Sequence, residues 1–291
     1  MDKSISLKEA KTFFPKRVQI SNKATYGKIL NIAGSKYYQG AAYLSSISAL
    51  KIGAGYLTLA CPDCILNNIA SVTPDLTFLP LRSFKEESIA SDNARMVQEK
   101  AVQFDVVSLG CGLSLNSSTV EFVDKFLQGY SSKNQIVIDA DGLNALAQME
   151  IKKLPQNTIL TPHPKELSRL INVDVEEINH NREYFATLAA EKYNAIVVLK
   201  GNKTVITDGK NNTFINLSGN SSLAKAGSGD VLTGIITGLI AQKLSPIDAS
   251  VLGTYIHGLS GEIASKELSE YSVIASDLIT YIPKAILKIT K

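Results

Sequence analysis

Short runs of apolar residues, rich in Val and Ile, recur along the chain between longer stretches of mixed polarity. Six such runs occupy residues 28–33, 56–60, 105–109, 135–139, 158–160 and 195–199. Their near-continuous hydrophobicity is typical of strands in a sheet that is covered on both faces. Because strands alternate with helical stretches, the crossovers between them are expected to be parallel. The pattern predicts an α/β protein with three layers, α/β/α.

Two later runs are spaced more closely than the earlier ones. Residues 203–207 and 213–217 are separated by a segment that begins with Asp208-Gly209, which is a turn signal. This spacing predicts an antiparallel edge on a mostly parallel central sheet. The sequence contains no internal repeat, low-complexity tract or Pro/Gly/Ser-rich linker, so we expect a single domain over residues 1–291.

Composition and charge exclude several classes of protein. With 45% hydrophobic and 20% charged residues, the chain is not expected to be disordered. A net charge of +3 is too weak to predict a nucleic-acid surface. The longest uncharged stretch, residues 106–120, is shorter than a membrane span, and residues 1–17 are charged throughout, unlike a secretory signal. We therefore expect a cytoplasmic protein with no membrane or nucleic-acid partner.

Glycines and polar side chains follow the carboxyl ends of five predicted strands. In an open α/β sheet, ligands bind at this edge. The segments are Gly34-Ser35 with Gly40-Ala41-Ala42, Gly110-Cys111-Gly112, Asp139-Ala140-Asp141-Gly142, Thr161-Pro162-His163-Pro164-Lys165-Glu166, and Lys200-Gly201. Together they predict a crevice for a polar, phosphorylated ligand.

A glycine-rich turn precedes the most apolar helical stretch of the chain. Gly227-Ser228-Gly229-Asp230 is followed by apolar pairs at 231/232, 235/236 and 239/240, a spacing that predicts one helix face. The turn would open a helix N-terminus, which binds phosphate. Asp230 has two interpretations: a residue that begins the helix, or a carboxylate that accepts the proton of an attacking hydroxyl. Gly234 and Gly238 predict close packing against a neighbouring helix.

Other recognised motifs are incomplete. The chain has no GxxxxGK[ST] sequence and no GxGxxG, so the support for a P-loop protein or a dinucleotide-fold dehydrogenase is weak. Cys61 and Cys64 form a CxxC, which indicates either a redox dithiol or two loop cysteines without a role. The remaining cysteine, Cys111, and the histidines are not at zinc-ligand spacing, so no metal-ligating set is predicted.

The order of these blocks closely resembles that of the ADP- or ATP-dependent NAD(P)H-hydrate dehydratases, members of the ribokinase-like superfamily. The matching blocks are Gly34-Ser35, Gly40-Ala41-Ala42, Gly53-Ala54-Gly55, Gly110-x-Gly112-Leu113, Asp139-Ala140-Asp141-x-Leu143, Leu160-Thr161-Pro162-His163-Pro164-x-Glu166, Leu199-Lys200-Gly201 and Gly227-Ser228-Gly229-Asp230-Val231-Leu232. The resemblance covers residues 27–264. Because some relatives carry an additional epimerase domain, for which this chain is too short, we expect a stand-alone dehydratase.

The resemblance implies a ribokinase-like fold and a metabolite-repair reaction. Water added to the nicotinamide ring of NADH or NADPH leaves a hydroxyl, giving NADHX or NADPHX. ADP or ATP, with Mg²⁺, would phosphorylate that hydroxyl, and the phosphate would then be eliminated. The resemblance also implies a homo-oligomer, commonly a tetramer. Which nucleotide is preferred, and which of the two hydrated dinucleotides, stays open.

The resemblance assigns a role to each matching residue. Asp230 would be the catalytic base and would also contact the hydrated dinucleotide, together with Ala41, Gly112 and His163. The nucleotide would be bound by Lys200, Gly201, Asn202, Lys203, Thr204 and Gly229, and the anion hole would be formed by Gly227, Ser228 and Gly229.

Several side chains keep a second interpretation. Lys200 could instead be a solvated lysine at a hairpin end, and a direct metal role for Glu166 stays open because His163 stands where many kinases of the superfamily have Asn. His163, between two prolines, is expected to be a positioned hydrogen-bond donor and not a core residue. One of Asp139 and Asp141 could cap a loop. His257, on an apolar helix over residues 251–263, is expected to pack or cap.

Two departures from the family pattern stand out. Ala226 replaces a glycine before the turn and is expected to stiffen it, and Gly142 replaces an alanine. The alternative function is a small-molecule kinase of the same superfamily, such as a vitamin-precursor kinase. The combination of His163-Pro164-x-Glu166 with Asp139-Ala140-Asp141 favours the dehydratase. A non-enzymatic nucleotide-binding module would leave Asp230 unexplained.

Overall fold

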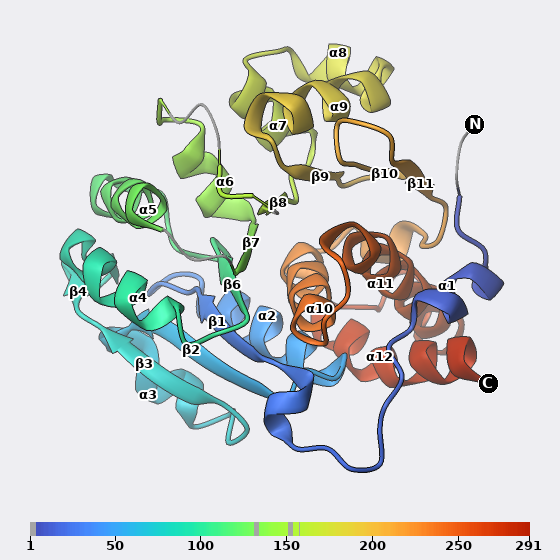
Figure 1. The fold of residues 1–291 in the computed structure, drawn as a ribbon, viewed down its shortest axis with the longest axis horizontal. Coiled ribbons are helices and arrows are strands. Elements are labelled where there is room, and N and C mark those ends of the chain that lie inside the picture. The colour runs from blue at the N-terminus through green and yellow to red at the C-terminus, as the bar shows by residue number, and fades with distance from the viewer. Residues whose placement is uncertain (1–3, 131–133, 151–153, 157) are drawn as a thin grey trace.

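A computed structural model describes residues 4–130, 134–150, 154–156 and 158–291. Its centre is a nine-stranded sheet with the order β11-β10-β9-β8-β7-β6-β1-β2-β3 (Figure 1). The strands are β1 (Lys28–Ile32), β2 (Tyr56–Pro62), β3 (Thr77–Leu81), β6 (Val106–Leu109), β7 (Gln135–Ile138), β8 (Thr158–Leu160), β9 (Ile196–Leu199), β10 (Thr204–Thr207) and β11 (Thr213–Asn216).

Most neighbouring strands of this sheet are parallel; among its described residues, the antiparallel pairs are β9–β10 and β10–β11. The predicted antiparallel edge is therefore confirmed. The sequence pattern did not predict β3 or the short pair β4 (Ser83–Phe84) and β5 (Ser88–Ile89). β3 contains Pro80, which removes a backbone donor and is tolerated because β3 is an edge strand.

Helices cover both faces of the sheet. One face carries α1 (Leu7–Phe13), α2 (Gln39–Lys51), α3 (Asp63–Ala70), α10 (Ser228–Ala241), α11 (Pro246–Leu268) and α12 (Ala275–Thr290). The other carries α4 (Ala94–Ala101), α5 (Ser117–Gly129), α6 (Ala140–Leu146), α7 (Pro164–Ile171), α8 (Val175–His180) and α9 (Arg182–Tyr193). Short 3₁₀ helices are η1 (Lys23–Tyr26), η2 (Ser91–Asn93) and η3 (Ser221–Leu223).

Two hydrophobic cores, one on each face, follow from the alternation of strand side chains. Val106 and Val107, for example, are both fully buried but belong to opposite cores. Strands buried on both faces must be apolar at successive positions, which is the pattern seen in the sequence. The three-layer α/β/α fold is confirmed.

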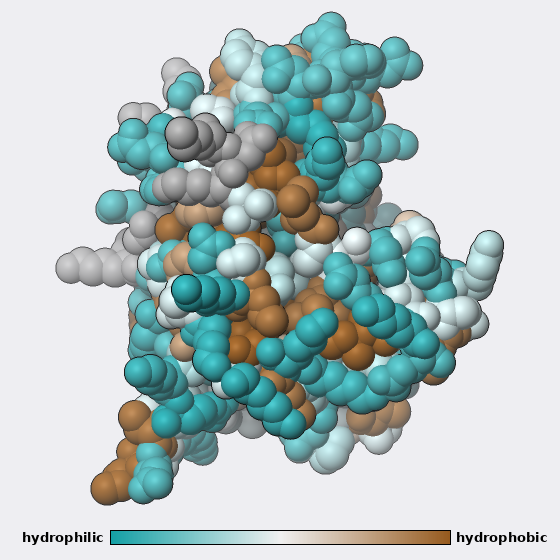
Figure 2. All heavy atoms as spheres, turned by 90° about the vertical axis from the view of Figure 1, so that its right-hand side faces the viewer, coloured by the Kyte–Doolittle hydropathy of each residue, from teal (hydrophilic) through white to brown (hydrophobic). Residues whose placement is uncertain are grey.

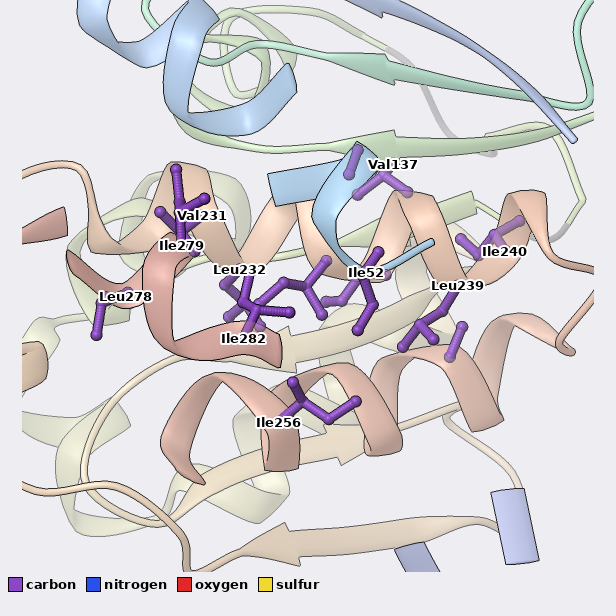
Figure 3. Packing of buried hydrophobic residues seen from close by; sticks show 14 of the residues in the cluster. Ile52, Val137, Val231, Leu232, Leu239, Ile240, Ile256, Leu278, Ile279 and Ile282 are labelled. Atoms are coloured by element: carbon purple, nitrogen blue, oxygen red, sulfur yellow. The ribbon is translucent and has the colours of Figure 1, made fainter. Parts of the chain in front are cut away.

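Helix α10 lies at the centre of the first core. Figure 3 shows its side chains clustered with Ile52, which follows α2, with Ile256 of α11 and with residues of α12. A Cβ at Gly234 would overlap the Ser48 hydroxyl, and one at Gly238 would overlap the Ile52 side chain. The close helix packing predicted from these two glycines is therefore confirmed, and the partner helix is α2.

The loops at the carboxyl ends of the strands are joined by backbone hydrogen bonds. The N–H of Gly110 donates to Ile32 O (3.2 Å), and the N–H of Asp139 donates to Leu109 O (3.0 Å). Farther along the sheet, the N–H of Lys200 donates to Pro162 O (2.8 Å). The predicted ligand-binding segments therefore lie side by side along the carboxyl ends of the parallel strands.

Hydrophilic residues predominate on the face seen in Figure 2, with smaller hydrophobic areas between them. This face is the right-hand side of Figure 1, where α1, α11 and α12 lie. Within the parts of the chain that the structure describes, we find no helix with the length and apolar character needed to span a bilayer.

Candidate active site

The glycine-rich turn forms the N-terminus of α10. Gly227 adopts a left-handed conformation (φ 87°, ψ −14°), and a Cβ there would also approach Leu44 Cδ1 to 2.6 Å. The positive φ in this turn belongs to Gly227 and not to Ala226, so Ala226 needs no left-handed conformation, and the stiffening that we expected from it stays a prediction. The N–H of Ser228 donates to Lys225 O (3.2 Å). Of the predicted anion hole, this leaves the Gly227 and Gly229 N–H groups and the Ser228 hydroxyl as donors.

Asp230 stands in the first turn of α10, beside the loop that follows β6. One ligating atom each of Cys111, Asp139 and Asp230 lies within 4.8 Å of the others. Burial raises the pKa of Asp230 to about 6, and the negative charge of Asp139 adds to this effect. Burial also raises the pKa of the Cys111 thiol well above its ordinary value, so that thiol is protonated. A carboxyl with a pKa near neutrality is suited to general base catalysis.

A buried cluster of charged side chains, Lys200, Asp139 and Glu166, lies next to the glycine-rich turn. Lys200 Nζ is 2.6 Å from Asp139 Oδ1 and 3.9 Å from Glu166 Oε2, and the Lys200 side chain is only 17% exposed. Burial alone would lower the pKa of Lys200, but the two carboxylates raise it above its ordinary value. The alternative of a solvated lysine is therefore wrong. The second oxygen of Asp139 accepts a hydrogen bond from Thr233 Oγ1 (2.6 Å).

Lys200 places its positive charge directly beside the glycine-rich turn. A Cβ built on Gly229 would lie 3.3 Å from Lys200 Nζ. An ammonium group fixed at this distance attracts a phosphoryl group held by the turn. The family resemblance placed Lys200 among the nucleotide-binding residues, but the link of Lys200 to Asp139 joins residues 61 positions apart and could not be seen in the sequence.

His163 and Glu166 cap helix α7 reciprocally. The Glu166 N–H donates to His163 Nδ1 (3.2 Å), and the His163 N–H donates to Glu166 Oε2 (2.8 Å). His163 Nδ1 is thus an acceptor, and its Nε2 is left to carry a proton. Burial and the charge of Lys200 lower the pKa of His163, so the ring is neutral. The side chain is 47% exposed, which agrees with a positioned donor and not with a core histidine.

A cavity of about 860 Å³ opens beside the turn. Its wall includes all six predicted nucleotide-binding residues, which are Lys200, Gly201, Asn202, Lys203, Thr204 and Gly229. Ser228 of the predicted anion hole, the predicted dinucleotide-binding residue His163, and Pro164, Leu232 and His257 line it as well. The sequence did not single out the remaining lining residues, which are Asn216, Leu217, Ser218, Gly219, Asn220, Ser221, Leu223, Ala224, Lys225, Thr254 and Gly258. The loop after β11 carried no motif, so only the fold brings it here.

The loop at residues 201–204 is held by its own hydrogen bonds and by one arginine. Thr204 Oγ1 donates to Gly201 O (3.0 Å), closing the turn. Arg182 Nη2 donates to the carbonyls of Leu199 (2.9 Å) and Lys200 (3.1 Å). Arg182 was not expected from the sequence, because it begins α9, far from any motif. It fixes the backbone from which Lys200 extends.

Of the predicted dinucleotide-binding residues, His163 lines this cavity, whereas Ala41 and Gly112 are not among its lining residues. A Cβ at Gly112 would lie 2.7 Å from Ala41 Cβ, so these two residues are in contact. Asp141 Oδ2 accepts a hydrogen bond from the Ser114 N–H (2.9 Å) and thereby holds the loop after β6. Asp141 is thus the loop-capping residue of the Asp139/Asp141 pair, and Asp139 is the one paired with Lys200.

The Cys61-x-x-Cys64 pair does not have the properties of a redox dithiol. Cys61 is buried in β2, and burial raises its pKa to about 12, whereas Cys64 is exposed on α3. A reactive thiol needs exposure and a lowered pKa. The redox interpretation is therefore wrong, and so is the placement of both cysteines in a loop.

The fold class of the chain follows from its similarity to solved structures. A ribokinase-like superfamily protein from Enterococcus faecalis V583 superposes with a TM-score of 0.86 over 99% of this chain and 96% of that one; at 23% identity, this shows the fold alone. The chain therefore has a ribokinase-like fold, with the glycine turn and Asp230 at its ligand-binding edge.

The chain belongs to the NAD(P)H-hydrate dehydratase family, whose model matches residues 29–284. It is 31% identical to an ADP-dependent (S)-NAD(P)H-hydrate dehydratase of Bacillus subtilis, covering 93% of this chain and 92% of that protein. A crystal structure of the ADP/ATP-dependent NAD(P)H-hydrate dehydratase from Bacillus subtilis, co-crystallized with ATP/Mg²⁺, superposes with a TM-score of 0.84 at 29% identity and 99% coverage of both chains.

A further relative is longer than this chain. The bifunctional NAD(P)H-hydrate repair enzyme of Moorella thermoacetica is 36% identical over 92% of this chain, which spans 51% of that protein. The chain thus spans about half the length of the bifunctional relatives that it matches.

Proposed function

We propose that the protein restores hydrated NADH or NADPH by an ADP- or ATP-dependent dehydration. The observation that carries this proposal is the position of two adjacent residues. Gly229 lines the cavity that has Lys200 and residues 201–204 in its wall, while Asp230 lies beside Cys111 and the loop leading to Gly112. A nucleotide on one side and a hydroxyl-bearing ring on the other would meet at the anion-binding turn.

In the proposed reaction, Asp230 accepts the proton of the ring hydroxyl. The hydroxyl oxygen attacks the terminal phosphorus of ADP or ATP, and AMP or ADP leaves. Hydroxide is a poor leaving group, whereas phosphate is a good one. The lone pair of the ring nitrogen therefore expels the phosphate, and the ring loses a proton from the adjacent carbon. The products are NADH or NADPH, inorganic phosphate, and AMP or ADP.

Charges in the site support the phosphoryl transfer. The turn supplies backbone N–H groups at a helix N-terminus, and Lys200 supplies a buried positive charge 3.3 Å from the position of a Gly229 Cβ. Gly227 keeps the turn in its left-handed conformation. The nucleotide's AMP part would lie against residues 201–204 and the loop after β11.

The donor set fits a magnesium ion held mainly by phosphates. Mg²⁺ in such sites is bound through one or two carboxylates and the substrate phosphates. Asp230 is the carboxylate beside the turn that would contact it, because both oxygens of Asp139 already accept hydrogen bonds from Lys200 and Thr233. The ion would neutralise phosphate charge. Cys111, a protonated thiol, is a poor ligand for a hard cation.

Three further proposals go with this function. One sheet continues through the described chain, which supports a single dehydratase domain over residues 1–291. The homotetramer stays a prediction from the family resemblance, and the cytoplasmic location stays a prediction from the composition of the chain. The alternative, a vitamin-precursor kinase, has the same fold: a hydroxyethylthiazole kinase of Pyrococcus horikoshii OT3 superposes with a TM-score of 0.61 at 15% identity, a likeness of fold alone.

Replacement of Asp230 tests the assignment of the base. We expect Asp230→Asn to lower kcat by about 10²–10⁴-fold, because Asn cannot accept the proton. The affinity for ADP should change by no more than about fivefold, because phosphate is held by backbone N–H groups and Lys200. Rates are measured as NADH absorbance regained from NADHX, and affinity by calorimetry. The same substitution at the exposed Asp75 controls for a general charge effect. Full turnover in Asp230→Asn would overturn the assignment.

A further inference from the structure

A buried histidine, His257, faces the glycine-rich turn from the buried part of helix α11. It is only 7% exposed, and it lines the same cavity as Ser228 and Gly229. Its Nε2 atom lies 3.1 Å from Ser228 Oγ. From the sequence we expected packing or capping, and burial agrees with packing. The hydrogen bond to the turn is an additional feature that packing does not require.

Ser228 has only one donor to offer a phosphoryl group. Its backbone N–H already donates to Lys225 O (3.2 Å), so only the side-chain hydroxyl remains. That hydroxyl has a single hydrogen and is in contact with His257. If the hydroxyl donated to the imidazole, only its lone pairs would face the phosphate, and these repel an anion. If the imidazole donates to the hydroxyl, the hydrogen is free for the phosphate.

The surroundings keep the imidazole neutral. Burial lowers the pKa of His257 to about 4; a hydrogen bond with the backbone of Ser228 opposes this lowering, and the charge of Lys200 adds to it. A neutral imidazole carries one N–H, and the position of that proton decides which way the hydrogen bond to Ser228 runs.

We propose that His257 is a positioning residue that donates its Nε2 proton to Ser228 Oγ and thereby directs the Ser228 hydroxyl hydrogen at the transferred phosphoryl group. The proposal rests on the anion hole of the proposed function. It extends that function by an element of nucleotide recognition, because the hydroxyl would contact the terminal phosphate of ADP and not its α-phosphate. His257 would thus help to distinguish a nucleoside diphosphate from the monophosphate product.

Two substitutions at His257 separate donation from space filling. The side-chain nitrogen of Gln reaches the place of Nε2, whereas that of Asn reaches the place of Nδ1. Calorimetric affinities for ADP and AMP are measured without any hydrated dinucleotide. We expect His257→Asn to weaken ADP binding by about tenfold, the effect of losing one hydrogen bond to a charged group. AMP binding should stay within about twofold, and His257→Gln should bind ADP within about twofold of the unaltered protein.

Removal of the hydroxyl provides the matched control. Ser228→Ala should weaken ADP binding about as much as His257→Asn, and the double variant should bind ADP no more weakly than Ser228→Ala alone, because both changes remove one interaction. Additive losses would overturn the proposal. So would an unchanged ADP affinity in His257→Asn, or an equal loss of ADP and AMP affinity, which would indicate a structural role in the cavity.

The position of the proton can be measured in the unaltered chain. The sequence has three histidines, so nitrogen NMR of a histidine-labelled sample gives few signals, and His257→Gln identifies the relevant one. The proposal expects a neutral ring protonated on Nε2 at pH 7; protonation on Nδ1 would overturn it. None of these measurements needs NADHX turnover. Failure of the repair reaction would therefore count against the proposed function, and loss of the ADP-selective effect would count against His257.

Discussion

The pKa of Asp230 is raised by the groups that surround it. Burial and the nearby charge of Asp139 raise its pKa to about 6, while Lys200 opposes the shift. A general base works only when deprotonated, so activity should be lost as the pH falls through this value. We expect kcat/KM to be constant above the pKa and to decrease about tenfold per pH unit below about pH 6. Initial rates of NADH recovery between pH 5 and 8 test this.

Two controls accompany the pH profile. Thermal melting at each pH excludes unfolding as the cause of lost activity. Glu166, whose pKa burial raises to about 7, titrates in the same range, so the profile is repeated with Glu166→Gln. The decrease below pH 6 should persist in that variant. A profile that stays flat down to pH 5 would contradict the role of Asp230 as base.

At the residue scale, some placements could be predicted from the sequence and others could not. The position of Gly227 and Asp230 at a helix N-terminus was predictable, because a glycine turn followed by a carboxylate and an apolar stretch is typical of a helix start. The pairing of Lys200 with Asp139 could not be predicted, because these residues follow strands β9 and β7, which are far apart in the sequence. The burial of Cys61 could likewise not be predicted from the CxxC pattern; it results from the position of Cys61 in β2, which pairs with a strand on each side.

At the scale of elements, helix α10 depends on close contact with α2. Ala at Gly234 would gain about 1 kcal/mol of helix propensity, but its Cβ would overlap Ser48 and the Ser45 carbonyl. Because both are part of a packed helix, we expect Gly234→Ala to lower the free energy of unfolding by about 1–3 kcal/mol. Urea unfolding measures the change.

Gly40 is the matched control for this substitution. It lies in the first turn of α2, is exposed, and has no atom within 4 Å of a built Cβ. Gly40→Ala should therefore leave stability unchanged or raise it by up to about 1 kcal/mol. Equal stability of both variants would show that the close packing of α10 against α2 does not stabilise the fold.

Strands and helices could be predicted where burial imposes an apolar pattern. Strand β3 could not be predicted. It lies at the edge of the sheet, so most of its side chains are not buried, and Pro80 argues against a strand. Helix α11 runs from Pro246 to Leu268, longer at both ends than the apolar stretch suggested. Its first turn is only partly buried and residues 266–268 at its C-terminal end are exposed, so hydrophobicity does not mark the two ends.

At the scale of the whole molecule, the parallel sheet determines which residues meet. Loops after β1, β6, β7, β8 and β9 lie at one edge because parallel strands end on the same side. This much follows from the order of strands and helices. The cavity wall formed by the loop after β11 and by α11 does not, because those residues carry no distinctive motif and reach the site only through the packing of the second half of the chain.

The most direct test of the account is the fate of the transferred phosphate. The protein is incubated with NADHX, Mg²⁺ and ADP or ATP, and three products are followed together: inorganic phosphate, AMP or ADP, and NADH absorbance. The account predicts that all three appear in equal amounts, and that unhydrated NADH causes no nucleotide consumption, because it offers Asp230 no ring hydroxyl. A stable phosphate ester that accumulates with nucleotide consumption, or faster phosphorylation of a vitamin-type alcohol than repair of NADHX, would contradict the dehydratase and favour the kinase.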